Sequence, residues 1–186
     1  MEPTTPEPVE STQASGSLSR RAVLAGAAGI AGVAAGLAAA APASAAQQSG
    51  WRWCNRCECL FYGGNYTTGW CVRGGGHNWR GSGNYEPHYN VNHGEDNWRW
   101  CTKCQSMWYG GGTNNSDCPA GGRHSREGSG NYSIDYGSDY GNNEQPGWRR
   151  CRKCYCLCYS GNGNGYCPAG NRHNFDGSRR YYLPYA

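Results

Sequence analysis

One pattern of cysteine and histidine occurs three times in this 186-residue chain and limits what the chain can fold into. Each copy begins with W-x-x-C-x-x-C, continues to C-x-x-G-x-x-H, and closes with G-S-x-x-Y. The opening tryptophans Trp51, Trp98 and Trp148 are 47 and 50 residues apart. Repeats of this length indicate one supersecondary unit per copy, with neighbouring copies burying each other's apolar faces.

The pattern divides the chain into a leader and three repeats. Repeat 1 covers residues 46–97, repeat 2 covers 98–147 and repeat 3 covers 148–186, after a leader of residues 1–45. No stretch of the repeats has apolar residues at the i, i+3, i+4 and i+7 spacing of a helix. The repeats are therefore predicted to be all-β, with about four short strands each.

Two all-β architectures fit three such repeats. The repeats could share one closed domain with pseudo-threefold symmetry, like a β-trefoil, or form three zinc-ribbon-like beads in tandem. Each repeat alone has little apolar material with which to form a stable core. The closed domain is therefore favoured, and the beads are the alternative.

The three cysteines and one histidine of each copy have the composition and spacing of a zinc site. Thiolate sulfur and imidazole nitrogen are the donors of structural Zn²⁺ sites, which are tetrahedral. Twelve or thirteen residues separate the second cysteine from the third, and five always separate the third from the histidine. The pattern predicts three structural zinc ions, held by Cys54, Cys57, Cys71 and His77, by Cys101, Cys104, Cys118 and His124, and by Cys151, Cys154, Cys167 and His173.

Disulfide bonds are the main alternative, because secreted cysteine-rich domains usually depend on them. Three repeated cysteines cannot all pair within their own copy, and a disulfide framework gives no reason for a histidine in step with them. Another metal, such as iron, is the third alternative. Zinc is favoured over both.

Three further cysteines lie outside this pattern. Cys59 and Cys156 hold equivalent places in their copies, five residues after the first cysteine. Near a threefold axis these two could pair as a disulfide after export, or remain buried thiols. Cys158 stands where the other copies have an aromatic residue, so it is expected in the core.

Residues 1–45 are predicted to be a signal peptide that is removed. Arg20 and Arg21 precede an Ala- and Gly-rich apolar stretch, and Ala43-Ser44-Ala45 fits a cleavage site. The arginine pair resembles a twin-arginine export signal. An ordinary secretory signal and a membrane anchor are the alternatives, and the small apolar area of Ala and Gly disfavours an anchor. We expect a secreted protein without membrane contact after the leader is removed.

The chain has few aliphatic residues but contains 8 Trp and 14 Tyr. Aromatic residues that recur in register are expected to form its core. Those that break register are candidates for binding a ligand by stacking: Trp70, Trp79, Trp108, Tyr89, Tyr136 and Tyr140. His88 and His93, also outside the pattern, are either solvated loop side chains or a second, weaker metal site.

No catalytic pattern accompanies the cysteines. A Cys3His set fills all four positions around zinc, whereas catalytic zinc keeps one position open. The motifs H-E-x-x-H, G-x-S-x-G and the P-loop are absent from the sequence. A net charge of +4 is too small to indicate nucleic-acid binding by itself. We therefore expect a protein that is not an enzyme.

The repeat W-x-W-C-x-x-C…C-P-A-G-G-x-H…G-S-G-N-Y, clearest from Trp98 to Tyr132, resembles one in uncharacterised exported bacterial proteins with twin-arginine-type signals. The resemblance covers residues 46–186 and implies no activity. We expect a secreted, zinc-stabilised binding module, with a polysaccharide or cell-surface glycan as its partner. A structural or self-associating surface protein and a binder of anionic polymers are the alternatives, and the oligomeric state is open.

Overall fold

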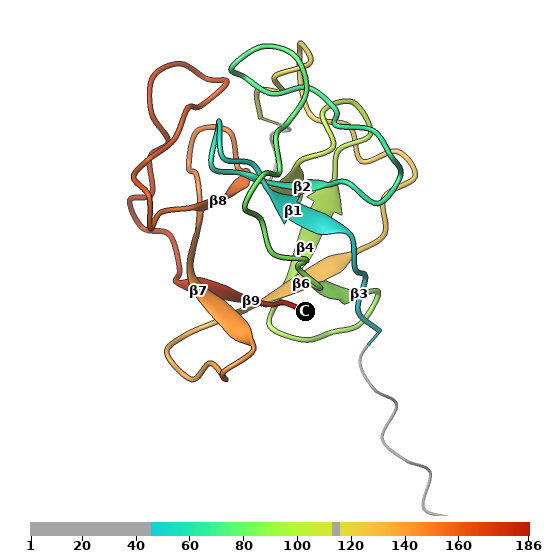
Figure 1. Ribbon diagram of the computed structural model, residues 1–186, viewed down its shortest axis with the longest axis vertical. Helices are drawn as coiled ribbons and strands as arrows, with labels where there is room; N and C mark the ends of the chain where they lie inside the picture. The colour runs from blue at the N-terminus through green and yellow to red at the C-terminus, as the bar shows by residue number, and fades with distance from the viewer. Residues whose placement is uncertain (1–45, 113–115) are drawn as a thin grey trace, which may run out of the picture. The chain divides into compact units, whose positions relative to one another are not determined.

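The computed structural model describes residues 46–112 and 116–186, and the predicted signal peptide lies outside them (Figure 1). The described residues form nine strands and no helix, which confirms the predicted all-β class. They accordingly contain no helix long and apolar enough to cross a membrane. The strands are β1 (Trp51–Trp53), β2 (Leu60–Tyr62), β3 (His88–Tyr89), β4 (Glu95–Trp100), β5 (Met107–Tyr109), β6 (Tyr132–Tyr136), β7 (Glu144–Arg150), β8 (Leu157–Tyr159) and β9 (Tyr181–Pro184).

Each repeat opens with an antiparallel hairpin. The strand at the opening tryptophan pairs with the strand after the C-x-x-C motif, so that β1 pairs with β2, β4 with β5 and β7 with β8. The closing tyrosine then returns to the opening tryptophan, as in the pairing of Trp98 with Tyr132 and of Trp148 with Tyr181. In repeat 1 the same contact is a single bridge between Trp51 and Tyr85.

A residue with positive φ precedes each opening tryptophan. Gly50, Asn97 and Gly147 have φ angles of 93°, 68° and 96°. In β4 and β7 the strand register shifts at this point, which is the signature of a β-bulge. The extra residue turns the following tryptophan side chain into the interior, where it is fully buried.

The three repeats close into a ring in two places. The second strands of the hairpins meet one another through the bridges Phe61–Ser106, Trp108–Cys156 and Cys59–Cys158. On the other side, β3 pairs with β6, β6 pairs with β9, and Tyr185 after β9 bridges back to Tyr85. Each repeat therefore contacts the next, and the third contacts the first. This confirms the closed pseudo-threefold domain, and the tandem-bead alternative is wrong.

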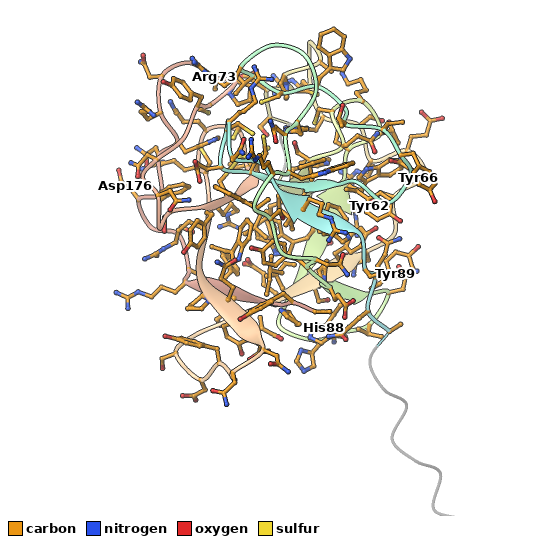
Figure 2. The ribbon with its side chains drawn as sticks, in the orientation of Figure 1. Tyr62, Tyr66, Arg73, His88, Tyr89 and Asp176 are labelled. Atoms are coloured by element: carbon orange, nitrogen blue, oxygen red, sulfur yellow. A yellow bond between two sulfur atoms is a disulfide. The ribbon has the colours of Figure 1, made fainter. Side chains whose placement is uncertain are left out.

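Aromatic residues form the core on one side of the ring. Trp51, Trp98 and Trp148 each meet the closing tyrosine of the following repeat edge to face, with ring centroids 5.0, 5.2 and 5.0 Å apart. The partly buried Tyr62 and Tyr89 pack against this group (Figure 2). Edge-to-face pairs add stability beyond their buried area, so these contacts supply the packing that aliphatic residues give most proteins.

A second buried cluster contains the cysteines. All twelve are buried, together with Phe61 and Trp108. The loops after β2, β5 and β8 contribute Cys71, Cys118 and Cys167 to this cluster. We call this group the sulfur cluster because most of its members are cysteines. Its members are Cys54, Cys57, Cys59, Cys71, Cys101, Cys104, Cys118, Cys151, Cys154, Cys156, Cys158, Cys167, Phe61 and Trp108.

Candidate metal centres and binding surface

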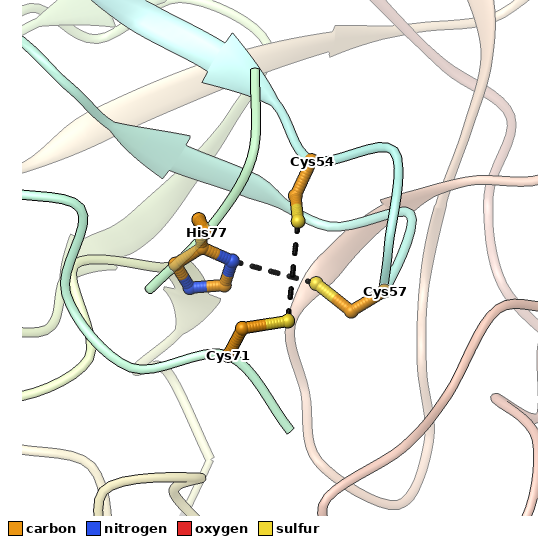
Figure 3. A group of neighbouring side chains, drawn as sticks. All are labelled: Cys54, Cys57, Cys71 and His77. Atoms are coloured by element: carbon orange, nitrogen blue, oxygen red, sulfur yellow. Dashed lines mark hydrogen bonds between the residues drawn. The ribbon is translucent and has the colours of Figure 1, made fainter. Parts of the chain in front are cut away.

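Within the sulfur cluster, the repeated cysteines and histidine of repeat 1 meet at one point. Figure 3 shows the three sulfur atoms and the histidine ring facing a common centre. Cys54 Sγ lies 4.0 Å from Cys71 Sγ, and Cys57 Sγ lies 3.5 Å from His77 Nδ1. All four residues are buried.

The other two repeats reproduce these distances. The equivalent sulfur–sulfur separation is 3.9 Å in both, and the equivalent sulfur–Nδ1 separation is 3.5 Å in both. A tetrahedron built on zinc–sulfur bonds of about 2.3 Å and zinc–nitrogen bonds of about 2.0 Å has edges of roughly 3.8 and 3.5 Å. The three predicted ligand sets are thus brought together as three Cys3His groups whose spacing fits a tetrahedral metal ion.

A backbone turn at each C-x-x-C motif places the first two sulfurs. The residue after the second cysteine is left-handed in every repeat, with φ of 69° at Glu58, 67° at Gln105 and 56° at Tyr155. Its N–H donates to the carbonyl of the first cysteine at 2.8 Å in each copy. The first cysteine's sulfur also accepts a backbone N–H from the residue after the histidine, as from Asn78 to Cys54 at 3.4 Å.

A second turn places the third sulfur. The segment from Cys71 is not a strand but folds back on itself, with the Cys71 N–H bonded to Gly75 O at 2.8 Å. Gly74 and Gly75 have φ of 84° and 64°, which only glycine adopts readily. Repeat 2 has the same turn, because Cys118 N–H bonds to Gly122 O at 2.9 Å. The described residues form three strands per repeat, so the prediction of about four is wrong.

Basic side chains tie the two turns of each site together. Arg56 donates to Arg73 O at 2.7 Å, and Lys103 and Lys153 donate to Gly121 O and Gly170 O at 2.6 and 2.5 Å. All three stand between the cysteines of their C-x-x-C motif and reach across to the turn of the third cysteine. They also bring positive charge to sites where the negative charge of three thiolates would exceed the positive charge of a bound divalent ion.

The thiols of each set compete for protons. Hydrogen bonds with Cys57 and Cys71 lower the pKa of Cys54, and hydrogen bonds with Cys54 and Cys71 raise the pKa of Cys57. Although burial opposes the charged ring, the hydrogen bonds with Cys54 and Cys71 raise the pKa of His77 to about 9. The first cysteine's pKa is lowered and the second's raised in the other repeats too. A divalent cation would displace these shared protons and let all three sulfurs ionise.

The histidines connect each site to the following repeat. His77 Nε2 lies 3.1 Å from the carbonyl of Cys104 in repeat 2, and His173 Nε2 lies 3.2 Å from the carbonyl of Cys57 in repeat 1. Such a partner holds the ring so that Nδ1 faces the metal position. In both cases the carbonyl belongs to the second ligand of the next site, so the site of repeat 1 is linked to that of repeat 2 and the site of repeat 3 to that of repeat 1. His124 of repeat 2 lies instead with its Nε2 3.6 Å from Cys156 Sγ of repeat 3. Ligand spacing within a repeat carries no signal of this link.

No protein family, curated protein or solved structure matches the chain. The three Cys3His groups in tandem agree with the repeats on which the resemblance to exported bacterial proteins was based. Membership of that group stays a prediction, as does the signal peptide.

The disulfide joins Cys59 to Cys158, and the predicted partner Cys156 is a free buried thiol. Cys59 and Cys158 face each other across a strand bridge, whereas Cys156 faces Trp108. In repeat 1, Phe61 stacks on His77 with ring centroids 4.5 Å apart. In repeat 3, Cys158 stands at the position equivalent to Phe61. Its side chain is shorter than a phenylalanine ring and leaves space beside His173, and Cys59 fills that space.

The six aromatic candidates for ligand binding do not form one surface. Trp108 is fully buried and stacks on His124, so its prediction as a ligand-binding residue is wrong. Tyr89 is half-buried against Tyr132. The other four are exposed: Trp70 and Trp79 lie in the connection between β2 and β3, Tyr136 ends β6, and Tyr140 lies between β6 and β7.

Tyr140, near the end of repeat 2, lines a cleft of about 410 Å³ together with Tyr159, Arg149 and Arg180 of repeat 3. A departure from the repeat accounts for the guanidinium groups there. In repeats 1 and 2 the arginine equivalent to Arg149 donates to an asparagine side chain, Asn84 or Asn131. Arg180 takes the place of that asparagine in repeat 3, and Arg149 instead donates to the carbonyl of Ser178 at 3.0 Å.

Trp79 lines a second, more open hollow of about 480 Å³ in repeat 1, with Arg56 and Arg80. Its ring stacks on the buried Phe61 with ring centroids 6.0 Å apart and planes 5° apart. The exposed face of Trp79 is therefore held in a fixed orientation. Both hollows combine an aromatic ring with arginine side chains.

Proposed function

We propose that this protein is an exported, non-enzymatic binding module that three structural zinc ions stabilise and that binds a polysaccharide carrying acidic sugars. The observation that carries the proposed binding is the cleft between repeats 2 and 3, where two tyrosine rings and two guanidinium groups line one cavity.

Zinc is the ion that the donor sets support best. Three sulfurs and one imidazole at tetrahedral spacing suit Zn²⁺ better than the oxygen-seeking Ca²⁺ and Mg²⁺. Bound zinc would cross-link the two turns of each repeat without redox chemistry. The buried sets offer four donors each and leave no open coordination position, which supports a structural role over a catalytic one.

The chemistry of the cleft supports an acidic polysaccharide as the ligand. Tyrosine rings stack on the apolar faces of sugars, and guanidinium groups bind carboxylates through paired hydrogen bonds. Tyr140 is 47% exposed and Arg180 is exposed, so both are available to a chain lying across the surface. Export is supported by the sequence of residues 1–45.

Native mass spectrometry of the purified protein tests the metal assignment. We expect a mass that includes three zinc ions and one disulfide, and loss of the folded charge-state distribution after a strong chelator. Protein without metal that keeps its fold with its cysteines oxidised would refute structural zinc.

Retention on immobilised polysaccharides tests the binding. Zinc-loaded protein should bind polygalacturonate more tightly than a neutral dextran of similar length. Tyr140→Ala and Arg180→Asn should each weaken that binding about tenfold or more, as expected for losing about 1.4 kcal/mol. The asparagine is the residue that the other repeats carry at this place.

Tyr66→Ala is the matched control, because Tyr66 is a 97% exposed tyrosine that does not line the cleft. It should leave polygalacturonate binding unchanged. Equal binding of inorganic polyphosphate, with no effect of Tyr140→Ala, would identify a general polyanion binder and overturn the proposal. Absence of binding to both polysaccharides at low salt would also overturn it.

A further inference from the structure

His88, His93 and Asp135 form a cluster outside the three Cys3His groups. His88 is in β3 and Asp135 is in β6, which pair with each other, and His93 follows in the loop that leads to β4. His88 lies beside Tyr89 at the end of the domain where the described chain begins (Figure 2).

The carboxylate of Asp135 lies between the two imidazole rings. His88 Nε2 is 3.0 Å from one carboxylate oxygen, and His93 Nδ1 is 2.7 Å from the other. The ring centroids of the two histidines are 4.2 Å apart. One ligand atom from each of the three residues lies within 4.8 Å of the others, close enough to contact a single ion.

The cluster is buried on one side and open on the other. His88 and Asp135 are 8% and 7% exposed, whereas the side chain of His93 is 54% exposed. An ion held here would keep coordination positions for water on the side of His93. The Cys3His groups have no exposed member, so the two kinds of site differ in access to solvent.

The ring of His88 can change its protonated nitrogen. Its Nε2 faces Asp135, and its Nδ1 is buried without a hydrogen-bond partner among the described residues. When no ion is bound, the Asp135 carboxylate accepts the proton of His88 Nε2. When an ion takes Nε2, the proton of the neutral ring moves to Nδ1, and the carboxylate needs no proton from His88.

We propose that His88, His93 and Asp135 form a fourth metal site, which binds an exchangeable divalent transition-metal ion such as Zn²⁺ or Cu²⁺. Two imidazole nitrogens and one carboxylate oxygen suit this class of ion, whereas Ca²⁺ and Mg²⁺ prefer oxygen donors alone. Three ligands with an open side hold an ion less tightly than the closed Cys3His groups. The bound ion would also hold the loop after β3 against β6.

Counting metals under two conditions tests this proposal. Native mass spectrometry should show four zinc ions per chain in excess zinc and three after a short treatment with a mild chelator. His93→Ala should hold three under both conditions and bind the fourth ion at least tenfold more weakly. Since His93 is exposed, this variant is expected to fold.

Asp139→Asn is the matched control, because Asp139 is an exposed carboxylate four residues from Asp135 and outside the cluster. It should keep the fourth ion. Co²⁺ added to protein with three zinc ions gives a second readout, since a site without sulfur shows weak d–d absorption and no thiolate charge-transfer band.

Two results would overturn the proposal: zinc-loaded wild-type protein that takes up no fourth ion from micromolar zinc, or a fourth ion that His93→Ala retains with unchanged affinity. Neither result depends on whether the protein binds a polysaccharide. Protein that retains three zinc ions but takes up no fourth would contradict only the proposed fourth site. Protein that holds fewer than three would contradict the structural zinc sites.

Discussion

Replacing Trp98 with alanine should destabilise all three repeats together. The side chain is fully buried and packs on Tyr109 of its own repeat and on Tyr181 of repeat 3, with centroids 5.4 and 5.2 Å apart. Its indole N–H has no hydrogen-bond partner among the described residues, so the change removes packing and no hydrogen bond that the structure describes. Truncating a buried tryptophan costs about 3–5 kcal/mol, and the lost aromatic pairs are included in that range.

The size of the loss can be measured as a change in the free energy of unfolding, with urea and a fixed excess of zinc. For a domain of this size, a loss of about 3–5 kcal/mol lowers the melting temperature by roughly 10–20 °C. Because Trp98 joins two repeats within a closed ring, we expect one transition, shifted as a whole. Calorimetry would resolve whether the transition stays single.

Trp70→Ala is the control for this experiment. Trp70 is also in the repeat region but is 56% exposed, and its replacement should change the free energy of unfolding by less than about 0.5 kcal/mol. A Trp98→Ala profile with two transitions, one at the wild-type position, would show that the repeats unfold independently. A loss no larger than that of Trp70→Ala would refute the reasoning from burial.

Other contacts give three further predictions. Burial raises the pKa of Tyr85 to about 12, so its contribution to the free energy of unfolding should be complete below the ordinary tyrosine pKa near 10 and be lost as the pH rises through 12. Tyr85→Phe should reduce this loss in alkaline unfolding curves, and a curve identical to that of the wild type would contradict the prediction. Arg150 stands where the other repeats have tryptophan, and its guanidinium carbon lies 4.3 Å from the centroid of the Tyr109 ring. Arg150→Ala should lower the free energy of unfolding in urea by about 0.5–1 kcal/mol, and Arg150→Trp should lower it less. Equal losses would contradict the stacking role. Reducing the Cys59–Cys158 disulfide, which joins residues 99 apart, should lower the free energy of unfolding by about 2–4 kcal/mol. The free energy of unfolding of a Cys59→Ser/Cys158→Phe double variant should not change with reductant. A wild-type protein whose stability also does not change with reductant would contradict this prediction.

The metal sets could be found from sequence because their geometry is local. A C-x-x-C turn brings two sulfurs together whatever the rest of the fold does, and a third cysteine and a histidine at constant spacing complete the set. The ring of repeats was also accessible, since a chain with little aliphatic material must share its buried surface. Register alone identified Trp51, Trp98 and Trp148 as core residues, and all three are fully buried.

Contacts between repeats were not accessible in the same way. Cys59 pairs with Cys158 and not with Cys156 because of the strand register at the ring closure, which no spacing within a repeat specifies. Trp108 was predicted to be exposed as an aromatic residue out of register, but it stands at the position equivalent to Phe61 and is buried like Phe61. Asp135 joins His88 and His93 only because β3 pairs with β6.

The ring also makes the starting point of the chain arbitrary. Both ends of the described chain meet the closing segment of repeat 1, through Gln48 N–H to Pro87 O at 3.1 Å and Ala186 N–H to Asn84 O at 3.0 Å. A circular permutant opened between two repeats would retain every bridge around the ring, whereas deleting repeat 1 would leave His173 and the carbonyl of Cys104 without their partners. An ancestral gene that encoded a single copy could have assembled the same architecture as a homotrimer before duplication fused the subunits.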